Sequence, residues 1–529
     1  MHKTYWIREL SCAGPHGHTT LGAQATIDPM TVDALPAEIS SYPLAAQTRE
    51  FFKQTRFGHV IDGDVSVSFS QATLPIHEPA SGLIFSHVAA GDRSDVDRAV
   101  AAARCAYEDG RWRNLPPVER ERRLRRLARL YEDHRELLSD LDVLEGGVLR
   151  GYSGFMVQLA IDIIDYYAGW PTKMHGTLPA SSPDLVIQQV REPIGVVGVI
   201  MPWNGPSAVP LGVVGALACG NSVVLKPAEQ TPLTAVLLAR LALEAGIPPG
   251  VFNVVQGVGE IVGAALVQHP QVDAICFTGS VETGRRIQAT AAARLKRVAL
   301  ELGGKSPQLV FADADLDKAA ATCAAAVWGH CGQVCIAGTR VLVDRRIHDE
   351  LVQRMIAASR DLRIGSGFDP RSQLGPLISQ AQLERVSGYV ALGREEGARV
   401  VLGGARYVNK GYFHQPTIFT GVHNDMRIAR EEIFGPVIAV IPFDTEDEAY
   451  SIANDTEYGL AAGVWTRDLA RAHRAAQRLD AGTVWVNTYL RVDPSVSYGG
   501  VKQSGFGRNL GLTSIDELTR IKSVWLDVS

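Results

Sequence analysis

A cysteine and a glutamate, each in a glycine-containing segment, are the residues of this chain best suited to chemistry. Cys335 lies in GQVCIAGTR at 332–340, and Glu301 lies 34 positions earlier in LELGGKSP at 300–307. A thiol between small residues is open to a substrate, and a carboxylate from a separate glycine-rich turn can serve it as a base. The pair therefore predicts a cysteine nucleophile assisted by a carboxylate.

Each of these residues also has a purely structural explanation. A lone cysteine is most often a small buried side chain, and Glu301 could instead pair with Lys305. Two neighbours of Cys335 could also do chemistry, since His330 precedes it by five positions and Cys331 by four. We expect Cys331 to be a packing residue, and we expect Glu301 rather than His330 to be the main base.

The order of four motifs carries a family resemblance. The motifs are MPWN at 201–204, LELGGKSP at 300–307, the segment around Cys335 and EEIFGPV at 431–437. This series, within a stretch from about Ile61 to Val524, resembles the NAD(P)-dependent aldehyde dehydrogenase superfamily. The resemblance implies an α/β fold with a Rossmann-type parallel-sheet cofactor domain, a second α/β catalytic domain and a small oligomerisation arm.

The resemblance also implies a mechanism. The Cys335 thiolate would attack an aldehyde carbonyl, and the side-chain amide of Asn204 and the backbone N–H of Cys335 would donate hydrogen bonds to the oxyanion. Hydride would then pass to the nicotinamide, and Glu301 would activate the water that hydrolyses the thioester. We therefore expect oxidation of a small-molecule aldehyde to the carboxylic acid, with no metal ion.

Several residues match positions at which the family binds NAD. Lys226 and Glu229 match the lysine and the glutamate that hydrogen-bond the adenosine ribose. Glu229 would also repel a 2′-phosphate, which favours NAD over NADP. Gly259 and Gly263 lie in a Gly-x-Gly-x-x-x-Gly run, one residue longer than the usual dinucleotide motif. Ser280 is expected at a helix start, where free amides attract a pyrophosphate. The other expected cofactor-binding residues are Trp203, Glu432 and Phe434.

Small residues predict a wide substrate pocket. The residues from Gly205 to Gly212, together with Gly329, stand where the family often has bulky aromatic side chains, and the chain between Asn204 and Gly220 is one residue shorter than the common pattern. A wide pocket favours an aromatic, terpenoid or ring-derived aldehyde over acetaldehyde. Further contacts to the substrate are expected from Trp328, Arg491 and Tyr498.

Composition argues against several other functions. The chain has 529 residues, of which 46% are hydrophobic and 21% charged, and its net charge is −5. Such a chain favours neither nucleic acid nor an anionic membrane as a partner. No apolar stretch approaches the length of a membrane span, and the first residues lack the apolar run of a signal peptide. Seven scattered cysteines indicate reduced thiols, so we expect a cytoplasmic enzyme.

Short apolar runs alternate with helical stretches through the middle of the chain. The runs lie at 195–202, 222–226, 251–255, 274–277 and 297–301. This alternation is typical of βαβ units on a parallel sheet. A second series after 306 predicts a second α/β domain that carries Cys335. Residues 117–145 are expected to form one helix, whose interleaved arginines and acids indicate a solvated face rather than nucleic-acid binding.

These elements and the resemblance predict a division of the chain. Residues 1–58 would be an N-terminal extension, 59–170 with 191–300 the NAD-binding domain, and 301–493 the catalytic domain. The segments 171–190 and 509–529 would be the arm and tail that exchange between the subunits of a homodimer or homotetramer.

Three other functions compete with aldehyde oxidation to the acid. In a CoA-acylating dehydrogenase, CoA would accept the acyl group, but such enzymes commonly lack a base at the position of Glu301. A non-redox cysteine acyl-hydrolase would leave the expected cofactor residues without a purpose. A non-catalytic protein on the same fold would have no need of Cys335, Glu301 and Asn204 together.

Overall fold

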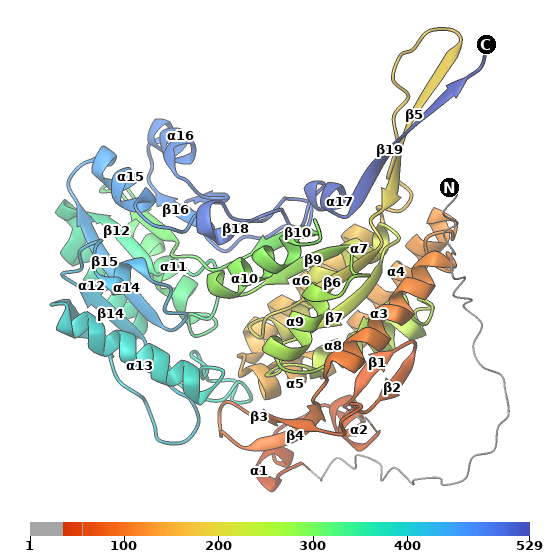
Figure 1. Cartoon of the computed structure of the whole chain (residues 1–529). Helices are drawn as coiled ribbons and strands as arrows, with labels where there is room; N and C mark the ends of the chain where they lie inside the picture. Colours follow the sequence, from red (N-terminus) through yellow and green to blue (C-terminus); the bar gives the residue numbers. More distant parts are fainter. Residues whose placement is uncertain (1–34, 55–56) are drawn as a thin grey trace.

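Two large sheets form the body of the chain (Figure 1). The structure is a computed structural model, and it describes residues 35–54 and 57–529. Most of the predicted extension 1–58 therefore lies outside the described residues. The first sheet has eight strands in the order β18-β10-β9-β6-β7-β8-β1-β2, and the second has seven in the order β13-β14-β15-β12-β11-β16-β17. The predicted α/β fold is confirmed.

The first sheet contains the predicted βαβ units. Its parallel strands are β6 (Val196–Ile200), β7 (Ser222–Lys226), β8 (Phe252–Val254), β9 (Ala274–Thr278) and β10 (Arg297–Glu301). Alternate residues enter two different apolar clusters, because successive side chains of a strand point to opposite faces. Val197 and Val199 pack on one face, whereas Val196 and Ile200 pack on the other.

Helices cover both faces of this sheet. One face packs against α6 (Arg150–Ala168), α7 (Pro210–Ala218) and α8 (Leu233–Glu244). The other packs against α3 (Arg93–Glu108), α9 (Ala264–Gln268) and α10 (Val281–Ala292). Two short helical turns occur in the connections, η1 (Pro206–Ala208) and η2 (Gly259–Gly263). The strand order reverses between β6 and β9, and such a reversal opens a crevice at the carboxyl ends of the strands.

Antiparallel strands complete both edges of the first sheet. One edge carries β1 (His59–Ile61) and β2 (Asp64–Ser66), and the other carries β18 (Gly505–Phe506) after η4 (Lys502–Ser504). β18 pairs with β10, so Glu301 lies opposite Gly505. The N-terminal part adds α1 (Ala37–Ser40), α2 (Ala46–Gln54) and the hairpin of β3 (Thr73–His77) and β4 (Ile84–Ala89).

The single helix expected over 117–145 is wrong. The structure has α4 (Pro117–Asp133) and α5 (Arg135–Gly146), which are separated at His134. His134 has φ −102° and ψ 16°, outside the helical range, and its ring nitrogen contacts the carbonyl of Leu130 at 2.8 Å. This local side-chain contact competes with continuation of the helix.

The second sheet is parallel except at β13. Its strands are β11 (Pro307–Val310), β12 (Arg340–Asp344), β13 (Arg399–Leu402), β14 (Thr417–Thr420), β15 (Val437–Phe443), β16 (Ala461–Trp465) and β17 (Thr483–Val486). The helices of this part are α11 (Leu316–Trp328), η3 (Arg345–Ile347), α12 (His348–Ser359), α13 (Gln380–Glu395), α14 (Arg427–Arg430), α15 (Glu446–Asn454) and α16 (Leu469–Arg478).

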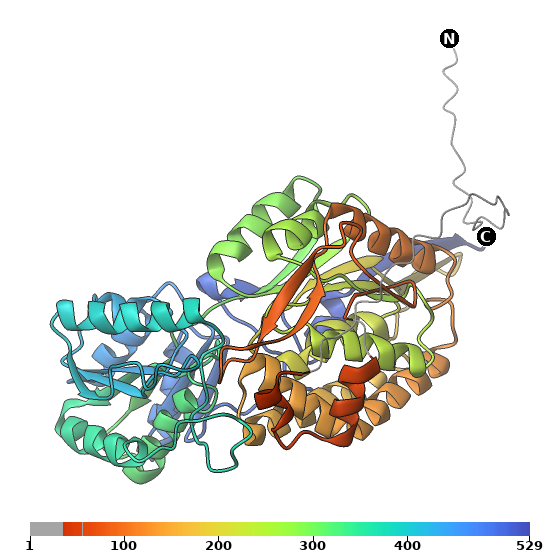
Figure 2. The same ribbon diagram turned by 90° about the horizontal axis from the view of Figure 1, so that it is seen from below.

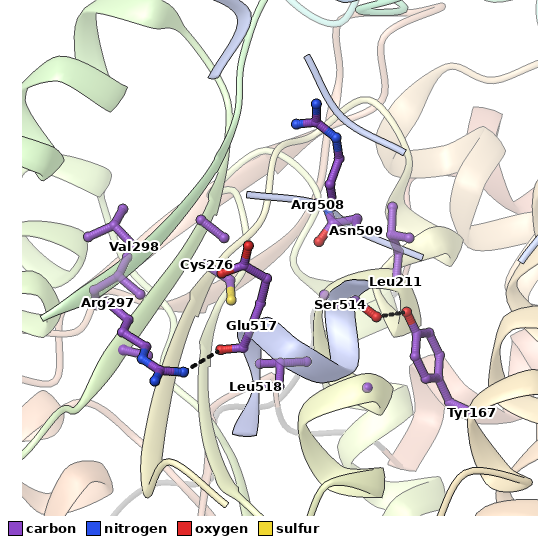
Figure 3. A pocket seen from close by; sticks show the side chains of 15 residues that line it. Tyr167, Leu211, Cys276, Arg297, Val298, Arg508, Asn509, Ser514, Glu517 and Leu518 are labelled. Atoms are coloured by element: carbon purple, nitrogen blue, oxygen red, sulfur yellow. Dashed lines mark hydrogen bonds between the residues drawn. The ribbon is translucent and has the colours of Figure 1, made fainter. Parts of the chain in front are cut away.

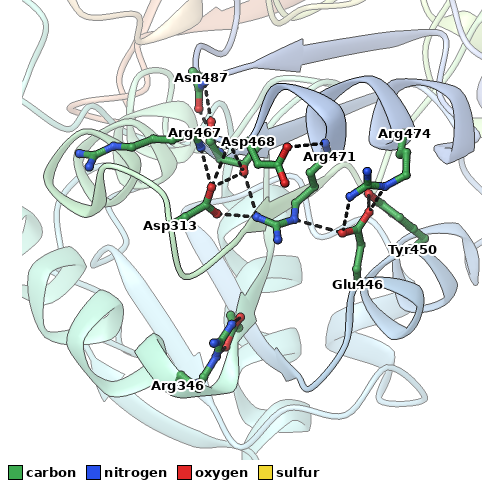
Figure 4. Close-up of polar contacts among 11 residues, drawn as sticks. Asp313, Arg346, Glu446, Tyr450, Arg467, Asp468, Arg471, Arg474 and Asn487 are labelled. Carbon is green, nitrogen blue, oxygen red and sulfur yellow. Dashed lines mark hydrogen bonds and ion pairs between the residues drawn. The ribbon is translucent and has the colours of Figure 1, made fainter.

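A polar network ties the outer helices of the second sheet together (Figure 4). The carboxylate of Asp313 accepts hydrogen bonds from Arg471 at 2.7 Å and from the hydroxyl of Thr466 at 2.8 Å. Arg471 also contacts Glu446 at 3.1 Å, and Arg474 contacts the same carboxylate at 2.8 Å. These ion pairs are partly solvated, so we assign them to joining α15 and α16 rather than to chemistry.

A two-stranded arm projects from the body (Figure 1). It consists of β5 (Leu185–Pro193) and β19 (Thr519–Asp527), which pair antiparallel along their length. Figure 2 shows that the arm and the second sheet lie at opposite ends of the molecule. Among the described helices, none combines the length and the apolarity that crossing a membrane requires.

The helix α17 (Thr513–Glu517) anchors the arm on the first sheet (Figure 3). The hydroxyl of Tyr167 meets that of Ser514 at 2.5 Å, and Arg297 donates to the carbonyl of Thr519 at 2.6 Å. The cavity between them, about 20 Å³, has room for roughly one water molecule. This cavity is too small to be a substrate site.

Candidate active site

A cleft runs along the carboxyl ends of the first sheet and reaches the second sheet. Its larger chamber, about 580 Å³, is lined by the ends of β6, β7 and β9. A smaller chamber of about 300 Å³ contains Asn204, Glu301 and Cys335. The residues that line both chambers are Pro202, Trp203, Thr278, Gly279 and Ser280. The three residues predicted to do the chemistry thus lie together at one end of a continuous cleft.

Cys335 is half-buried on the loop between α11 and β12. Its sulfur lies 3.3 Å from the hydroxyl oxygen of Tyr498, a residue that the sequence placed in the substrate pocket. Burial raises the pKa of the thiol to about 11, and the contact with Tyr498 lowers it. Because the thiolate is the nucleophile, a thiol with such a pKa needs a base to take its proton.

Glu301 ends β10 and is only 5% exposed. Its Oε2 has no hydrogen-bond partner among the described residues, and burial raises the pKa of the carboxyl to about 8. A glycine makes room for it, since a Cβ on Gly499 would stand 2.7 Å from Oε1. Glu301 is therefore a carboxyl that can take up or release a proton near neutral pH.

Asn204 lies on the turn that follows β6. Its side-chain nitrogen donates to the carbonyl of Gln333 at 2.8 Å, two residues before Cys335. An amide nitrogen carries two hydrogens, so this bond fixes the side chain and leaves a second N–H for another acceptor. That N–H and the backbone N–H of Cys335 are the donors available for an oxyanion in this chamber.

The larger chamber contains the residues predicted for the adenosine end of a cofactor. They are Lys226, Glu229, Gly259 and Gly263. Lys226 ends β7 and donates to Glu229 at 2.8 Å, so the two charges already neutralise each other in part. Their pairing weakens the repulsion of a 2′-phosphate that we expected from Glu229 alone. Gly259 faces open space, because no atom lies within 4 Å of a Cβ built there.

The residues predicted for the nicotinamide end lie in the smaller chamber. The rings of Trp203 and Phe434 meet edge to face with their centres 5.3 Å apart. The carboxylate of Glu432 accepts a hydrogen bond from the N–H of Gly304 at 3.0 Å. A Cβ on Gly303 would collide with this carboxylate, so the glycine pair after Glu301 admits Glu432 to the cleft.

Ser280 caps the N-terminus of α10. Its hydroxyl accepts a hydrogen bond from the N–H of Thr283 at 3.3 Å, which is the simple structural explanation for this residue. The same residue also lines both chambers. Since α10 has twelve residues, its first amides can still attract a diphosphate at this point.

These features together fit a dinucleotide. The cleft lies where the strand order reverses, which is the usual nucleotide position in open parallel sheets. Each chamber contains a carboxylate that can accept hydrogen bonds from a ribose, Glu229 in the larger and Glu432 in the smaller. The start of α10 at Ser280 lies between them. The open space at Gly259 would admit a bulky group close to the backbone.

Two residues of α13 line the smaller chamber and were not predicted. Gln382 donates to the carbonyl of Phe434 at 2.7 Å, and Arg385 donates to the carbonyl of Glu432 at 2.5 Å. Phe434 has a left-handed φ of 61°, which is uncommon for a residue with a side chain. These bonds hold the segment in that conformation. No sequence signal links α13 to this segment, because the contact depends on the fold.

Neither neighbour of Cys335 is placed as a second reactive group. Cys331 is buried in the apolar cluster of the second sheet. His330 is also buried, its ring stacks on Tyr152 with centres 5.3 Å apart, and burial lowers the pKa of its imidazole to about 4. A neutral, stacked His330 is a packing residue rather than the main base.

Two residues expected to shape the substrate pocket have other roles. Trp328 is buried in the second apolar cluster and donates from its indole N–H to the hydroxyl of Ser359 at 2.9 Å. A Cβ on Gly212 would stand 2.7 Å from the sulfur of Met201, so this glycine lets α7 approach the end of β6. The expectations that Trp328 contacts the substrate and that Gly212 widens the pocket are therefore wrong.

Gly205 and Gly329 face α6. A Cβ on Gly329 would lie 3.8 Å from the ring of Tyr152, and one on Gly205 would lie 3.2 Å from the terminal methyl of Met156. Tyr152 and Met156, which sequence reasoning missed, thus fill part of the space that the glycines leave. The Arg491 side chain is exposed, and its carbonyl accepts a hydrogen bond from an indole N–H at 3.1 Å.

Known proteins resemble this chain over nearly its whole length. The sequence model of the aldehyde dehydrogenase family matches residues 67–524. The chain is 44% identical over 466 residues to the rat (Rattus norvegicus) protein "Aldehyde dehydrogenase, cytosolic 1", covering 87% of this chain and 93% of that relative. It is 43% identical over 497 residues to the mitochondrial aldehyde dehydrogenase of Sus scrofa, covering 93% and 95% of the two chains.

Solved structures show the same likeness. An NAD⁺ complex of aldehyde dehydrogenase from Bacillus cereus has a TM-score of 0.90 at 40% identity, covering 92% of this chain and 100% of that chain. The P. syringae indole-3-acetaldehyde dehydrogenase AldA, in complex with NAD⁺ and IAA, has a TM-score of 0.88 at 42% identity, covering 90% and 97%. The predicted enzyme class is confirmed, and the predicted cofactor is the one that these solved relatives hold. The chain belongs to the aldehyde dehydrogenase family.

Proposed function

We propose that this chain uses NAD to oxidise a ring-bearing aldehyde to the carboxylic acid, with Cys335 as nucleophile and Glu301 as base. The observation that carries the proposal is the meeting of Asn204, Glu301 and Cys335 in one chamber that continues into a nucleotide-sized cleft. The NAD⁺ complexes of solved relatives support the choice of cofactor.

Three side chains divide the chemistry among them. The Cys335 thiol gives its proton to water in the cleft and its sulfur bonds to the aldehyde carbon, while Asn204 and the N–H of Cys335 donate to the oxygen that becomes negative. NAD, when bound, supplies the acceptor for the hydride of the aldehyde. Glu301 then takes a proton from water, the water oxygen bonds to the acyl carbon, and the C–S bond breaks to release the acid and the thiolate.

Cofactor binding is proposed for both chambers. Lys226 and Glu229 would hold the adenosine ribose, and the start of α10 at Ser280 would face the diphosphate. Glu432 would accept hydrogen bonds from the nicotinamide ribose, with Trp203 and Phe434 beside the ring. NAD should be preferred to NADP, although the Lys226–Glu229 ion pair makes the preference moderate.

The substrate class rests on the wall opposite the glycines. Tyr152 stacks on His330, and burial, followed by the charge of a nearby Cys335 thiolate, raises the pKa of the Tyr152 hydroxyl, so this aromatic wall stands near the nucleophile. Phe155, on the same helix, is 49% exposed and its ring lies 6.2 Å from that of Tyr152. Flat apolar walls favour flat apolar substrates. The name of the P. syringae relative, indole-3-acetaldehyde dehydrogenase, points to a ring-bearing aldehyde for that enzyme.

An aldehyde panel tests the proposal. We expect NADH formation with indole-3-acetaldehyde and benzaldehyde at kcat/KM values at least about tenfold above that for acetaldehyde, because each buried CH₂ contributes roughly 0.8 kcal/mol. Mass spectrometry of the product should detect the free acid whether or not CoA is added. Acyl-CoA as the main product would favour the CoA-acylating alternative, and acetaldehyde as the best substrate would exclude a pocket for rings.

The arm supports a homo-oligomer. Its exposed apolar side chains are Val190 at 36%, Ile521 at 53%, Trp525 at 63% and Leu526 at 43%. Apolar side chains gathered on a projecting two-stranded sheet favour pairing with a second copy. Light scattering should give the mass of a homodimer or homotetramer, and removal of 519–529 should give smaller species. The cytoplasmic location and the domain limits stay predictions.

A further inference from the structure

A buried carboxylate lies beneath the turn that follows Asn204. Asp142, on α5, is 1% exposed and accepts hydrogen bonds from the backbone N–H of Ser207 at 2.9 Å and from its hydroxyl at 2.7 Å. The hydroxyl of Ser153 donates to the same carboxylate at 2.7 Å. Ser207 is the middle residue of η1, which begins two residues after Asn204. The carboxylate therefore holds the segment that directly follows Asn204, the predicted oxyanion donor.

Stability alone does not explain an acid in this place. The hydrogen-bond partners of Asp142 are hydroxyls and an amide rather than a cation, and burial raises the pKa of its carboxyl to about 6. A buried carboxylate without a cation is costly, and an apolar or amide side chain could fill the space at lower cost. Such a group is expected where it fixes the geometry of a functional site.

Other side chains reinforce the same turn. Glu145, one helical turn after Asp142, accepts from the N–H of Leu233 at 2.9 Å at the start of α8. From that helix the hydroxyl of Thr234 donates to the carbonyl of Pro206 at 3.0 Å. The hydroxyl of Tyr131 donates to the carbonyl of Ser207 at 2.7 Å. η1 is thus held at two carbonyls, one N–H and one hydroxyl.

On its other side, the amide of Asn204 donates to the carbonyl of Gln333, and the buried ring of His330 hydrogen-bonds the backbone of Asn204. The direction of the free side-chain N–H of Asn204 therefore depends on how η1 positions the backbone of Asn204. An oxyanion donor is effective only within a few tenths of an ångström of its ideal position. We propose that Asp142 is a positioning residue, which acts through Ser207 and η1 to aim the amide of Asn204 at the oxyanion. This inference rests on the proposed role of Asn204.

A double-mutant cycle on kcat/KM for an aldehyde tests the proposal. The variants are Asp142→Asn, Asn204→Ala and the pair, each assayed with saturating NAD and a limiting aromatic aldehyde. We expect Asn204→Ala to lower kcat/KM by roughly 10²-fold, as loss of one oxyanion donor does, and Asp142→Asn by roughly 10-fold. In the Asn204→Ala background, Asp142→Asn should cost less than about threefold, because the group it positions is gone.

Asp140→Asn is the matched control. Asp140 is also fully buried on α5, where it accepts from the N–H of Ala45 at 2.8 Å and from Thr48 at 2.6 Å and forms an ion pair with Arg150, away from η1. We expect this variant to keep kcat/KM within about twofold of wild type. Ser207→Ala, which keeps the buried acid and removes one of its bonds, covers the case in which Asp142→Asn does not fold. It should lower kcat/KM by about two- to fivefold, and only when Asn204 is present.

The outcomes separate the two proposals. An Asn204→Ala variant with wild-type kcat/KM would exclude the oxyanion role of Asn204 itself. If Asn204→Ala lowers kcat/KM but Asp142→Asn lowers it by the same factor in the wild type and in the Asn204→Ala background, Asp142 does not act through Asn204. Equal losses for Asp140→Asn and Asp142→Asn would also overturn the positioning role. NAD affinity, measured by fluorescence titration, should be unchanged in all variants.

Discussion

Replacing Glu301 by glutamine should stabilise the protein while it removes the base. Glu301 is 5% exposed, its Oε2 has no partner among the described residues, and burial raises the pKa of the carboxyl from 4.5 to about 8. The folded state therefore binds this proton more tightly than the unfolded state does. Below pH 4.5 both states are protonated and nothing is lost. As the pH rises from 4.5 to about 8, the unfolded state ionises first and the folded state loses stability.

The size of the effect follows from the two pKa values. Each pH unit between them changes the free energy of unfolding by about 1.4 kcal/mol. The loss relative to low pH is then about 1 kcal/mol at pH 5 and about 3 kcal/mol at pH 7. Glutamine does not titrate, so the free energy of unfolding of Glu301→Gln should exceed that of the wild type by an amount that grows with pH.

Denaturant unfolding of both proteins at pH 5, 6, 7 and 8 measures this difference. Glu244→Gln is a suitable control, because Glu244 is an exposed residue at the end of α8 and its substitution should have no comparable effect. A stability difference for Glu301→Gln that stayed constant from pH 5 to pH 8 would refute a raised pKa. In the same variant, steady-state turnover should fall while a rapid first formation of NADH remains.

Three further predictions concern the cleft. Cys335→Ala should abolish aldehyde oxidation and leave NAD affinity near wild type, whereas Cys331→Ala should keep most activity. If the two phenotypes were reversed, the assignment of Cys335 as the nucleophile would be wrong. Glu229→Gln should narrow the preference for NAD over NADP, by about tenfold or less because Lys226 already neutralises part of its charge, and a wild type that prefers NADP would contradict this. Gly329→Phe should displace the ring of Tyr152 and lower kcat/KM for ring-bearing aldehydes by about tenfold, with little change for acetaldehyde. Equal losses for both substrates would show that Tyr152 does not line the substrate pocket.

The strands and the three central residues of the site could be predicted from the sequence. Each parallel strand is an apolar run of a few residues followed by a turn, and Asn204, Glu301 and Cys335 lie in or beside such turns. Asn204 follows β6 and Glu301 ends β10, so the parallel order of the first sheet is enough to gather these two residues at one edge. Cys335 precedes β12 of the second sheet, and only the family resemblance placed it with them. The break at His134 was missed, because no glycine or proline marks it in the sequence.

The substrate pocket could not be predicted in the same way. Trp328 contacts Ser359, and Gly212 lies against Met201. The residues next to Trp328 and Gly212 in the sequence do not show whether they pack in the core or line a pocket. The role proposed for Asp142 depends on a segment 65 positions away, and no motif marks that distance. Residues that fill space between elements are specified by tertiary packing, which a single sequence does not reveal.

The pairing of β18 with β10 also bears on how the protein is made. Glu301 pairs with Gly505, and every strand of the second sheet is synthesised between them. During synthesis, the edge of β10 that pairs with β18 stays unpaired while about 200 more residues are added, which takes roughly 10–40 s at ordinary rates of translation. An unpaired edge strand is a template for pairing with other chains, so this interval is one in which chaperones would be useful. The strand that carries the proposed base receives its last partner only after the whole second sheet has been synthesised.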